Sequence, residues 1–191
     1  LVFSDLRIAT MSDEDASRYL SYDLENTKKV NKYYRVTKTT NGTTTTEVSE
    51  EEATNATKNT ATRGASYTTT YKNIQISATP TGTKNRYSIE LTNLWLKSPY
   101  IKSYDVIAIR TDDATVLEGT QNGVQSYIYT NGSVGYVYYS NNGTNMVKAS
   151  NGFGISMNLV DAANTFECDI EATVTATTEW ATVYGSYQHA A

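Results

Sequence analysis

Residues 166–176 read FECDIEATVTA, and this stretch decides the fold class. Apolar side chains occupy every second position from Phe166 to Val174, with acidic or polar side chains between them. A period of two is typical of a β-strand with one apolar and one polar face, as in an antiparallel sheet. The stretch therefore predicts a long strand that lines a hydrophobic core.

Similar patterns lie on both sides of this strand. Upstream, apolar residues alternate through 74–78 and, after a Pro-Thr-Gly turn, through 87–91, which predicts a hairpin. Asn131 and Gly132 separate two apolar runs, and an Asn-Gly pair is a strong signal for a second hairpin. Further strands are expected at 33–38, 106–109, 153–159 and 180–187.

After residue 91 the apolar phase shifts to Leu94 and Leu96, which predicts a β-bulge near Asn93. In all, about eight to ten short strands separated by turns predict a mainly β protein. We expect an antiparallel β-sandwich, jelly-roll-like or Ig-like, with one N-terminal helix. That helix is expected at 12–29, since Ser12 can cap it and acidic residues fill its first turn.

Residues 39–66 differ from the rest of the chain. They include a run of four threonines and three consecutive glutamates, and Val48 is their only sizeable hydrophobic residue. A segment that buries so little apolar surface does not offset the entropy of ordering it. We therefore expect an N-terminal helix and first strand in 1–38, a polar loop or linker in 39–66 and a β-sandwich domain in 67–191.

Composition excludes several classes of protein. The 191 residues carry 16 Lys plus Arg against 20 Asp plus Glu, and the net charge of -4 disfavours a phosphate-backbone binder. A single cysteine, Cys168, rules out a disulfide framework or a multi-cysteine zinc site. No apolar run approaches the ~20 residues of a membrane helix, so no membrane span is expected.

One basic and aromatic run resembles a single-stranded nucleic-acid binder in composition. It combines Tyr33 and Tyr34 with the cations Lys28, Lys29, Lys32, Arg35 and Lys38. Because lysines at a helix end have a structural use and the chain is acidic overall, we expect no nucleic-acid partner.

Residues able to perform catalysis are few. His189 is the only histidine, and its place near the C-terminus suits a frayed strand end better than a catalytic base. Cys168 is one of the alternate positions on the apolar face of the strand at 166–176, where burial raises the pKa of a thiol. Glu167, Asp169 and Glu171 share one strand face, which is the expected arrangement of solvated charges rather than of a catalytic pair in a cleft. We expect no enzyme and no cofactor.

A weak candidate for a metal site combines Asp112, Asp113 and Glu118, whose carboxylate oxygens are ligands that calcium prefers. Their spacing lacks the regular pattern of a calcium loop, so an ordinary turn is the expected structure and no metal site is assigned.

The tyrosines are the strongest candidates for binding. The chain has 16 of them, and five lie in the Asn-Gly hairpin at Tyr127, Tyr129, Tyr136, Tyr138 and Tyr139. Several of these are expected to share one face as cross-strand neighbours. Exposed aromatic rings among amides and hydroxyls recognise the flat faces of sugar rings. Tyrosine is also an excellent strand former, and coverage of the sheet remains the alternative explanation.

Three stretches carry a resemblance to a known family. They are WLKSP at 95–99 leading into SYDVIAIR at 103–110, NGFGISMNL at 151–159, and YGSYQHA at 184–190. Over roughly residues 20–190 the chain resembles a family of uncharacterised exported proteins from Gram-positive bacteria. The resemblance implies an exported, β-rich protein and carries over no activity or catalytic residue. Such proteins continue with another strand, so this chain is expected to be truncated or to leave a sheet edge open.

The Thr-, Asn- and Tyr-rich composition also favours an extracellular or cell-surface location, with any export signal outside this chain. We therefore expect an exported, surface-associated, non-catalytic β-domain that binds a glycan or cell-wall polymer. The alternative is a structural or assembly protein that contacts another surface protein through its sheet edges.

Overall fold

The computed structural model describes residues 3–58, 69–96, 98–99 and 102–189. Its helical segments are α1 (Asp5–Thr10), α2 (Asp13–Leu20), the 3-10 turn η1 (Leu24–Asn26) and α3 (Glu50–Lys58). Its strands are β1 (Lys28–Thr39), β2 (Gly42–Val48), β3 (Thr69–Pro80), β4 (Arg86–Trp95), β5 (Tyr104–Asp112), β6 (Ala114–Val116), β7 (Asn122–Tyr129), β8 (Val134–Tyr139), β9 (Met146–Ala149), β10 (Gly152–Asn158), β11 (Ala163–Ala176) and β12 (Thr182–Gln188).

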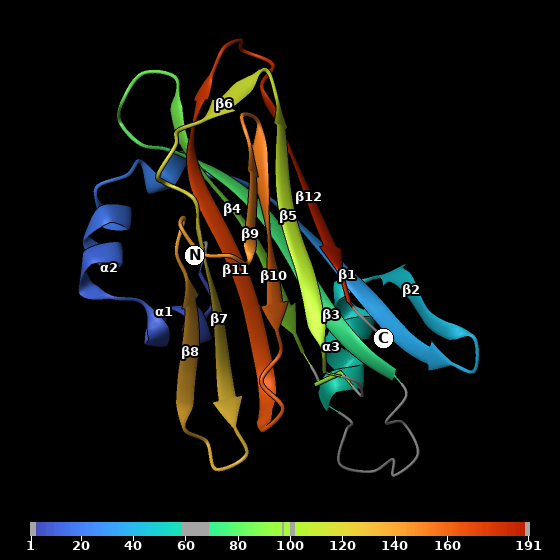
Figure 1. Cartoon of the computed structure of the whole chain (residues 1–191). Coiled ribbons are helices and arrows are strands. Elements are labelled where there is room, and N and C mark those ends of the chain that lie inside the picture. The colour runs from blue at the N-terminus through green and yellow to red at the C-terminus, as the bar shows by residue number, and fades with distance from the viewer. Residues whose placement is uncertain (1–2, 59–68, 97, 100–101, 190–191) are drawn as a thin grey trace.

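The strands form two antiparallel sheets that pack face to face (Figure 1). The larger sheet has the order β2-β1-β3-β4-β11-β7-β8, with β6 paired to the end of β11. The smaller sheet has the order β12-β5-β10-β9. The expected antiparallel β-sandwich with an N-terminal helical segment is therefore confirmed, as are the hairpins β3–β4 and β7–β8.

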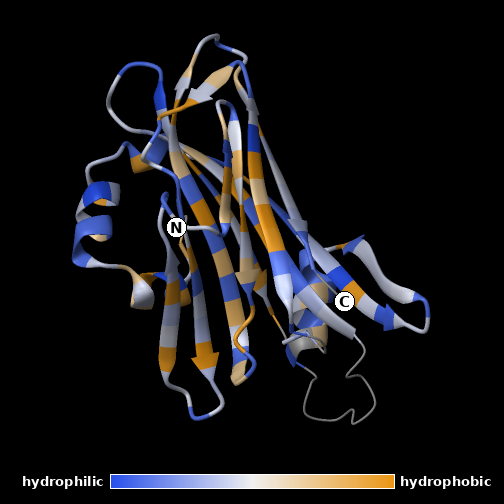
Figure 2. Ribbon diagram, in the orientation of Figure 1, coloured by the Kyte–Doolittle hydropathy of each residue, from blue (hydrophilic) through white to orange (hydrophobic). Residues whose placement is uncertain are grey.

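The core lies between the two sheets, where apolar residues occupy alternate positions of most strands (Figure 2). Trp95 of β4 and Phe166 of β11 are fully buried on the larger sheet, and Ile107 and Ile155 are fully buried on the smaller one. Because these side chains interdigitate, the position of every inward residue is fixed by the register of its strand.

The N-terminal segment differs from the single helix expected at 12–29. Ser12 caps α2 as predicted, its side chain accepting a hydrogen bond from the backbone N–H of Asp15, but α2 ends at Leu20. A second helix, α1, precedes it and is capped in the same way by Ser4. The chain then enters β1 at Lys28, because pairing with β3 satisfies its backbone groups better than an isolated helix end does.

The expectation of a polar loop at 39–66 was wrong for the part of this range that the structure describes. Residues 42–48 form β2, which pairs with β1 through a seven-residue register, and α3 follows at once. Threonine is β-branched and suits a strand without being apolar, so backbone pairing orders this segment. In α3, Ala53 is fully buried and Glu52 forms an ion pair with Arg35 at 3.2 Å. Residues 59–66 lie outside the described residues.

The bulge predicted near Asn93 was also wrong. The registers of β4 with β3 and with β11 run without a break from residue 87 to Trp95. Ile89, Leu91, Asn93 and Trp95 all point inward, and Leu94 points outward. The phase shift in the sequence therefore marks a polar residue inside the core rather than a backbone irregularity.

Gly152 marks a close approach of β10 to β5, and a methyl group there should destabilise the protein. A Cβ at this position would collide with the carbonyl oxygen of Ile109 and lie 3.1 Å from Cα of Arg110. Because the obstacle is backbone, the two strands must separate, and Gly152→Ala should cost about 1–3 kcal/mol in urea unfolding. The exposed Ser150→Ala is the control, and equal midpoints for the two variants would refute this assignment.

Candidate functional site

The structure divides the five candidate tyrosines between two faces of the β7–β8 hairpin. Tyr127, Tyr129 and Tyr139 point into the sandwich, and Tyr127 is 8% exposed. Tyr136 and Tyr138 point outward and are 60% and 56% exposed. Where β7 and β8 pair, each tyrosine lies opposite a smaller residue and not opposite another tyrosine. The expected row of exposed rings is therefore reduced to two tyrosines on one strand.

A cleft does form where two of these tyrosines meet the smaller sheet. It has a volume of about 420 Å³, within the usual range for small-ligand sites. Its aromatic walls are Tyr139 at the end of β8 and Tyr104 at the start of β5, and Tyr104 is 54% exposed. Tyr138 also borders the cleft, but its ring lies on the opposite face of β8, among charged residues of α1 and α2. We call it the tyrosine cleft.

The remainder of the tyrosine cleft combines the apolar Val137 and Met146 with polar side chains. Ser140, Thr144, Asn145 and Asn158 present hydroxyl and amide groups around the rings. The Asn145 amide donates to the carbonyl oxygen of Ser156 at 3.1 Å, which holds the loop before β9 against β10. The cleft thus joins apolar ring faces to donors and acceptors, as recognition of a polyhydroxylated ligand requires.

Sequence reasoning named only Tyr138 and Tyr139 among the ten residues that line this cleft and missed the other eight. Tyr104 pairs with Asn158 across β5 and β10, far along the chain from the β7–β8 hairpin. Asn145 lies in the loop after β8. No local pattern connects these positions, because the cleft exists only where the edge of one sheet meets the other.

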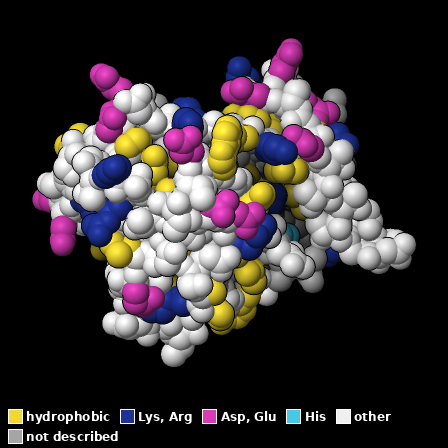
Figure 3. All heavy atoms as spheres, turned by 90° about the horizontal axis from the view of Figure 1, so that it is seen from above, with side chains coloured by type: hydrophobic (Ala, Val, Ile, Leu, Met, Phe, Trp, Pro, Cys, Tyr) yellow, Lys and Arg dark blue, Asp and Glu magenta, His cyan; other side chains and the backbone are white. Residues whose placement is uncertain are grey.

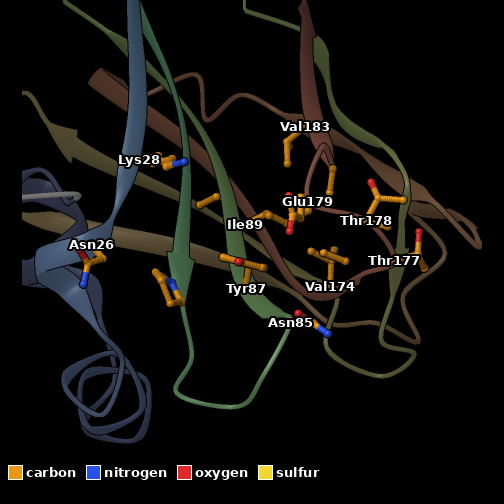
Figure 4. A pocket seen from close by; sticks show the side chains of 15 residues that line it. Asn26, Lys28, Asn85, Tyr87, Ile89, Val174, Thr177, Thr178, Glu179 and Val183 are labelled. Carbon is orange, nitrogen blue, oxygen red and sulfur yellow. The ribbon is translucent and has the colours of Figure 1, made fainter.

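A larger pocket of about 630 Å³ opens between the sheets at the opposite end of the sandwich. Its floor is apolar, with Ile89, Val174 and Val183 contributed by three different strands (Figure 4). Lys28 and Glu179 lie at its rim, and Trp180, next in sequence, is 81% exposed. Figure 3 views the molecule from above and shows hydrophobic side chains scattered among charges of both signs, without a patch of one sign.

The prediction that Glu167, Asp169 and Glu171 are solvated was wrong. All three are at most 6% exposed, as is Glu90 on the neighbouring strand β4. The cause is the N-terminal segment, which lies over the outer face of the larger sheet: Ser4 donates to Glu167 at 2.9 Å, and Arg18 donates to Glu171 at 2.6 Å. We call these four acidic residues the carboxylate layer.

Burial shifts the titration of the carboxylate layer. It raises the pKa of Glu90 to about 8 and that of Glu171 to about 7. Burial, together with the adjacent Glu167 and Glu90 carboxylates, holds the pKa of Asp169 well above its ordinary value. The opposing charge is Arg7, buried in α1, whose Nε lies 3.8 Å from a carboxylate oxygen of Asp169.

Raised carboxyl pKa values often mark catalytic acids, but this layer offers a substrate no space. The cavity beside Glu90 has a volume of about 10 Å³, enough for no more than one water molecule. Its other walls include Phe3, Tyr19 and Leu24 of the covering segment. The geometry therefore favours a structural role for the carboxylates in seating α1 and α2.

His189 lies differently from the frayed strand end expected of it. It follows directly on β12, and its Nδ1 is 2.8 Å from a carboxylate oxygen of the buried Asp105. Its ring also packs at 5.0 Å from that of Trp95. Cys168 is fully buried beside this group, and burial raises the pKa of its thiol, as predicted.

The weak metal candidates do not converge. Asp112 binds Arg110 at 2.7 Å, Glu118 binds Lys148 at 2.6 Å, and Asp113 adopts a positive φ of 57° in a turn. In the part of the chain that the structure describes, no three His, Cys, Asp or Glu residues are placed to hold a metal ion.

The basic and aromatic run lies along β1 rather than at a helix end. Arg35 pairs with Glu52, and Lys32 lies 4.0 Å from Glu47 of β2. Among the described residues, no helix is long and apolar enough to cross a membrane. No protein-family model and no curated protein sequence matches the chain.

Proposed function

We propose that this protein is an exported, surface-associated, non-catalytic domain that binds a glycan or cell-wall polymer in the tyrosine cleft. The observation that carries the proposal is the juxtaposition of Tyr104 and Tyr139 with the amides of Asn145 and Asn158. The Tyr104 ring is more than half exposed, which is the condition for stacking against a sugar.

The chemistry of the lining favours this class of ligand. The cleft lies where β8 and β10 end and where β5 and β9 begin. Its lining contains no Lys, Arg, Asp or Glu, which favours a neutral ligand over a phosphate or a polyanion.

Substitution of the exposed Tyr104 ring should weaken binding without unfolding the domain. We expect Tyr104→Ala to weaken binding about tenfold or more, since buried aromatic contacts dominate such interfaces. The assay is a pull-down of the purified domain on insoluble cell walls and a polysaccharide panel, followed by dissociation constants for each hit.

Tyr136→Ala is the matched control, because Tyr136 is exposed to a similar extent as Tyr104 but does not line the cleft. It should retain full affinity. Equal losses at Tyr104 and Tyr136, or loss only on Trp180→Ala beside the larger pocket, would contradict the assignment of the cleft, and no binding to any glycan would contradict the proposed ligand class.

Assembly through a sheet edge is the second candidate, and one observation favours it. Among the described residues, β12 pairs only with β5 and so presents its other edge to a partner strand. This role predicts a mass that rises with concentration in sedimentation experiments, and a strictly monomeric protein at high concentration would exclude self-assembly.

A further inference from the structure

Three reactive side chains meet at one place in the core. Lys72 of β3 and Asn93 of β4 both point inward from the larger sheet, and Asp105 of β5 points toward them from the smaller sheet. They are 3%, 0% and 1% exposed. An amine, a carboxamide and a carboxyl group are rarely buried together, and neither glycan binding nor the fold explains this group.

Asn93 is the least explained of the three. Neither its amide nitrogen nor its amide oxygen has a hydrogen-bond partner among the described residues. Its neighbours across the two adjacent strands are Ile74 and Cys168. An amide buried without partners costs free energy in folding, so an apolar residue would be the better choice for packing alone.

Lys72 is held in an apolar, aromatic enclosure. Its Nζ lies 4.4 Å from the centroid of the Tyr187 ring and 5.4 Å from that of Trp95. Burial lowers the pKa of Lys72 to about 8, and the charge of Asp105 partly opposes this shift by raising the pKa. Near neutral pH a useful fraction of the side chain is therefore an uncharged, nucleophilic amine.

The strand register brings the amine to the amide. Lys72 pairs with Trp95 and Ile74 pairs with Asn93, so Lys72 and Asn93 are diagonal neighbours on one face of an antiparallel pair. Such residues are about 7–8 Å apart, a distance that a lysine side chain spans. Asp105 is fixed close by, since it accepts hydrogen bonds from Tyr187 and interacts with His189 at 2.8 Å.

We propose that Lys72 and Asn93 form an intramolecular amide bond between their side chains, with Asp105 as the acid–base group. The reaction would tie β3 to β4 inside the core. It would replace the buried amine of Lys72 and the unpartnered carboxamide of Asn93 by one neutral secondary amide.

The reaction balances without any co-reactant. Asp105 takes a proton from the Lys72 ammonium, and the freed Nζ lone pair attacks Cγ of Asn93 to give a tetrahedral centre. Asp105 then gives a proton to Nδ2 and receives one from Nζ. The Cγ–Nδ2 bond breaks, its electron pair leaves with ammonia, and the carbonyl re-forms as a secondary amide.

The mass of the intact, purified chain tests the proposal directly. In strong denaturant, the wild-type protein should be lighter than its sequence by the mass of one ammonia molecule. A tryptic digest should contain the peptide with Lys72 joined to the peptide with Asn93, and cleavage after Lys72 should be lost. The full sequence mass would overturn the proposal, as would a loss of ammonia without this joined pair.

A loss of one water instead of ammonia would place the bond on a carboxylate and would equally overturn the assignment to Asn93. Lys72→Met and Asp105→Asn should both have their full sequence masses. The control Lys148→Met removes an exposed ion pair, and the mass of this variant should still be lower than its sequence mass by one ammonia. An Asp105→Asn variant whose mass is still lower than its sequence mass by one ammonia would overturn the role given to Asp105.

Discussion

The free energy of unfolding should fall by several kcal/mol as the pH rises from about 5 to about 8. The cause is the carboxylate layer beneath α1 and α2. Glu90 and Glu171 have pKa values of about 8 and about 7 in the folded protein, against about 4.3 for an unfolded glutamate. Asp169 and Glu167 are shifted in the same direction by burial.

The sign follows from proton linkage. Between the unfolded and folded pKa values the folded state binds more protons than the unfolded state, so each of these carboxyls favours folding at low pH. The stabilisation is complete below about pH 4 and is lost as the pH rises through the folded values, by at most ~1.4 kcal/mol per pH unit for each proton. Arg7 and Arg18 reduce the effect, and Asp15 adds to it.

Urea unfolding at a series of pH values measures this dependence. Glu90→Gln mimics the protonated carboxyl, so it should change stability little near pH 5 and should increase it near pH 8, flattening the profile. A profile that rises from pH 5 to pH 8, or a Glu90→Gln variant with an unchanged slope, would show that the layer is not protonated in the folded state.

Removal of Arg7 should be the most damaging single change on the outer face of the sheet. Arg7 is 4% exposed and lies between Asp169 and Asp15, at 3.8 Å and 3.7 Å. Arg7→Met keeps much of the volume but leaves the buried carboxylates without their nearest buried cation. We expect a loss of about 3–5 kcal/mol at pH 8, where the layer is most ionised.

The loss should shrink at pH 5, because neutral carboxyls need no counter-charge. The exposed Arg86→Met, at the start of β4, provides the control and should change stability little at either pH. An equal loss for Arg7→Met at both pH values would indicate lost packing rather than lost charge, and would contradict the electrostatic account.

The alternation of apolar residues was enough to predict the sandwich and its hairpins. It worked best in β11, where Phe166, Cys168 and Ile170 are all fully buried as expected. Alternation assigns residues to two faces, but it does not say what covers the second face. Glu167, Asp169 and Glu171 were placed on the correct face and given the wrong environment, because α1 and α2 lie over them.

Asn93 shows a second limit of the same reasoning. A polar residue among inward positions was interpreted as a bulge, since an inward amide has no packing advantage. The continuous register of β4 shows that the residue is simply buried. Breaks of the hydrophobic pattern in an otherwise regular strand are thus places to look for chemistry.

The tyrosine cleft could not be predicted, because its walls come from β5, β8 and β10 and from the loop after β8. Of the hairpin tyrosines only Tyr139 directs its ring to the cleft, and the second ring, Tyr104, comes from the other sheet. The sequence therefore indicated the kind of residue that lines the proposed site, but not the surface on which the site lies.

The most direct test of glycan binding in the cleft is an NMR titration of the isotope-labelled domain with a soluble fragment of the best polysaccharide hit. We expect saturable shifts of the side-chain amides of Asn145 and Asn158 and of the backbone amides around Tyr104 and Tyr139. Shifts confined to the region of Glu179 and Val183, at the larger pocket, would contradict the account.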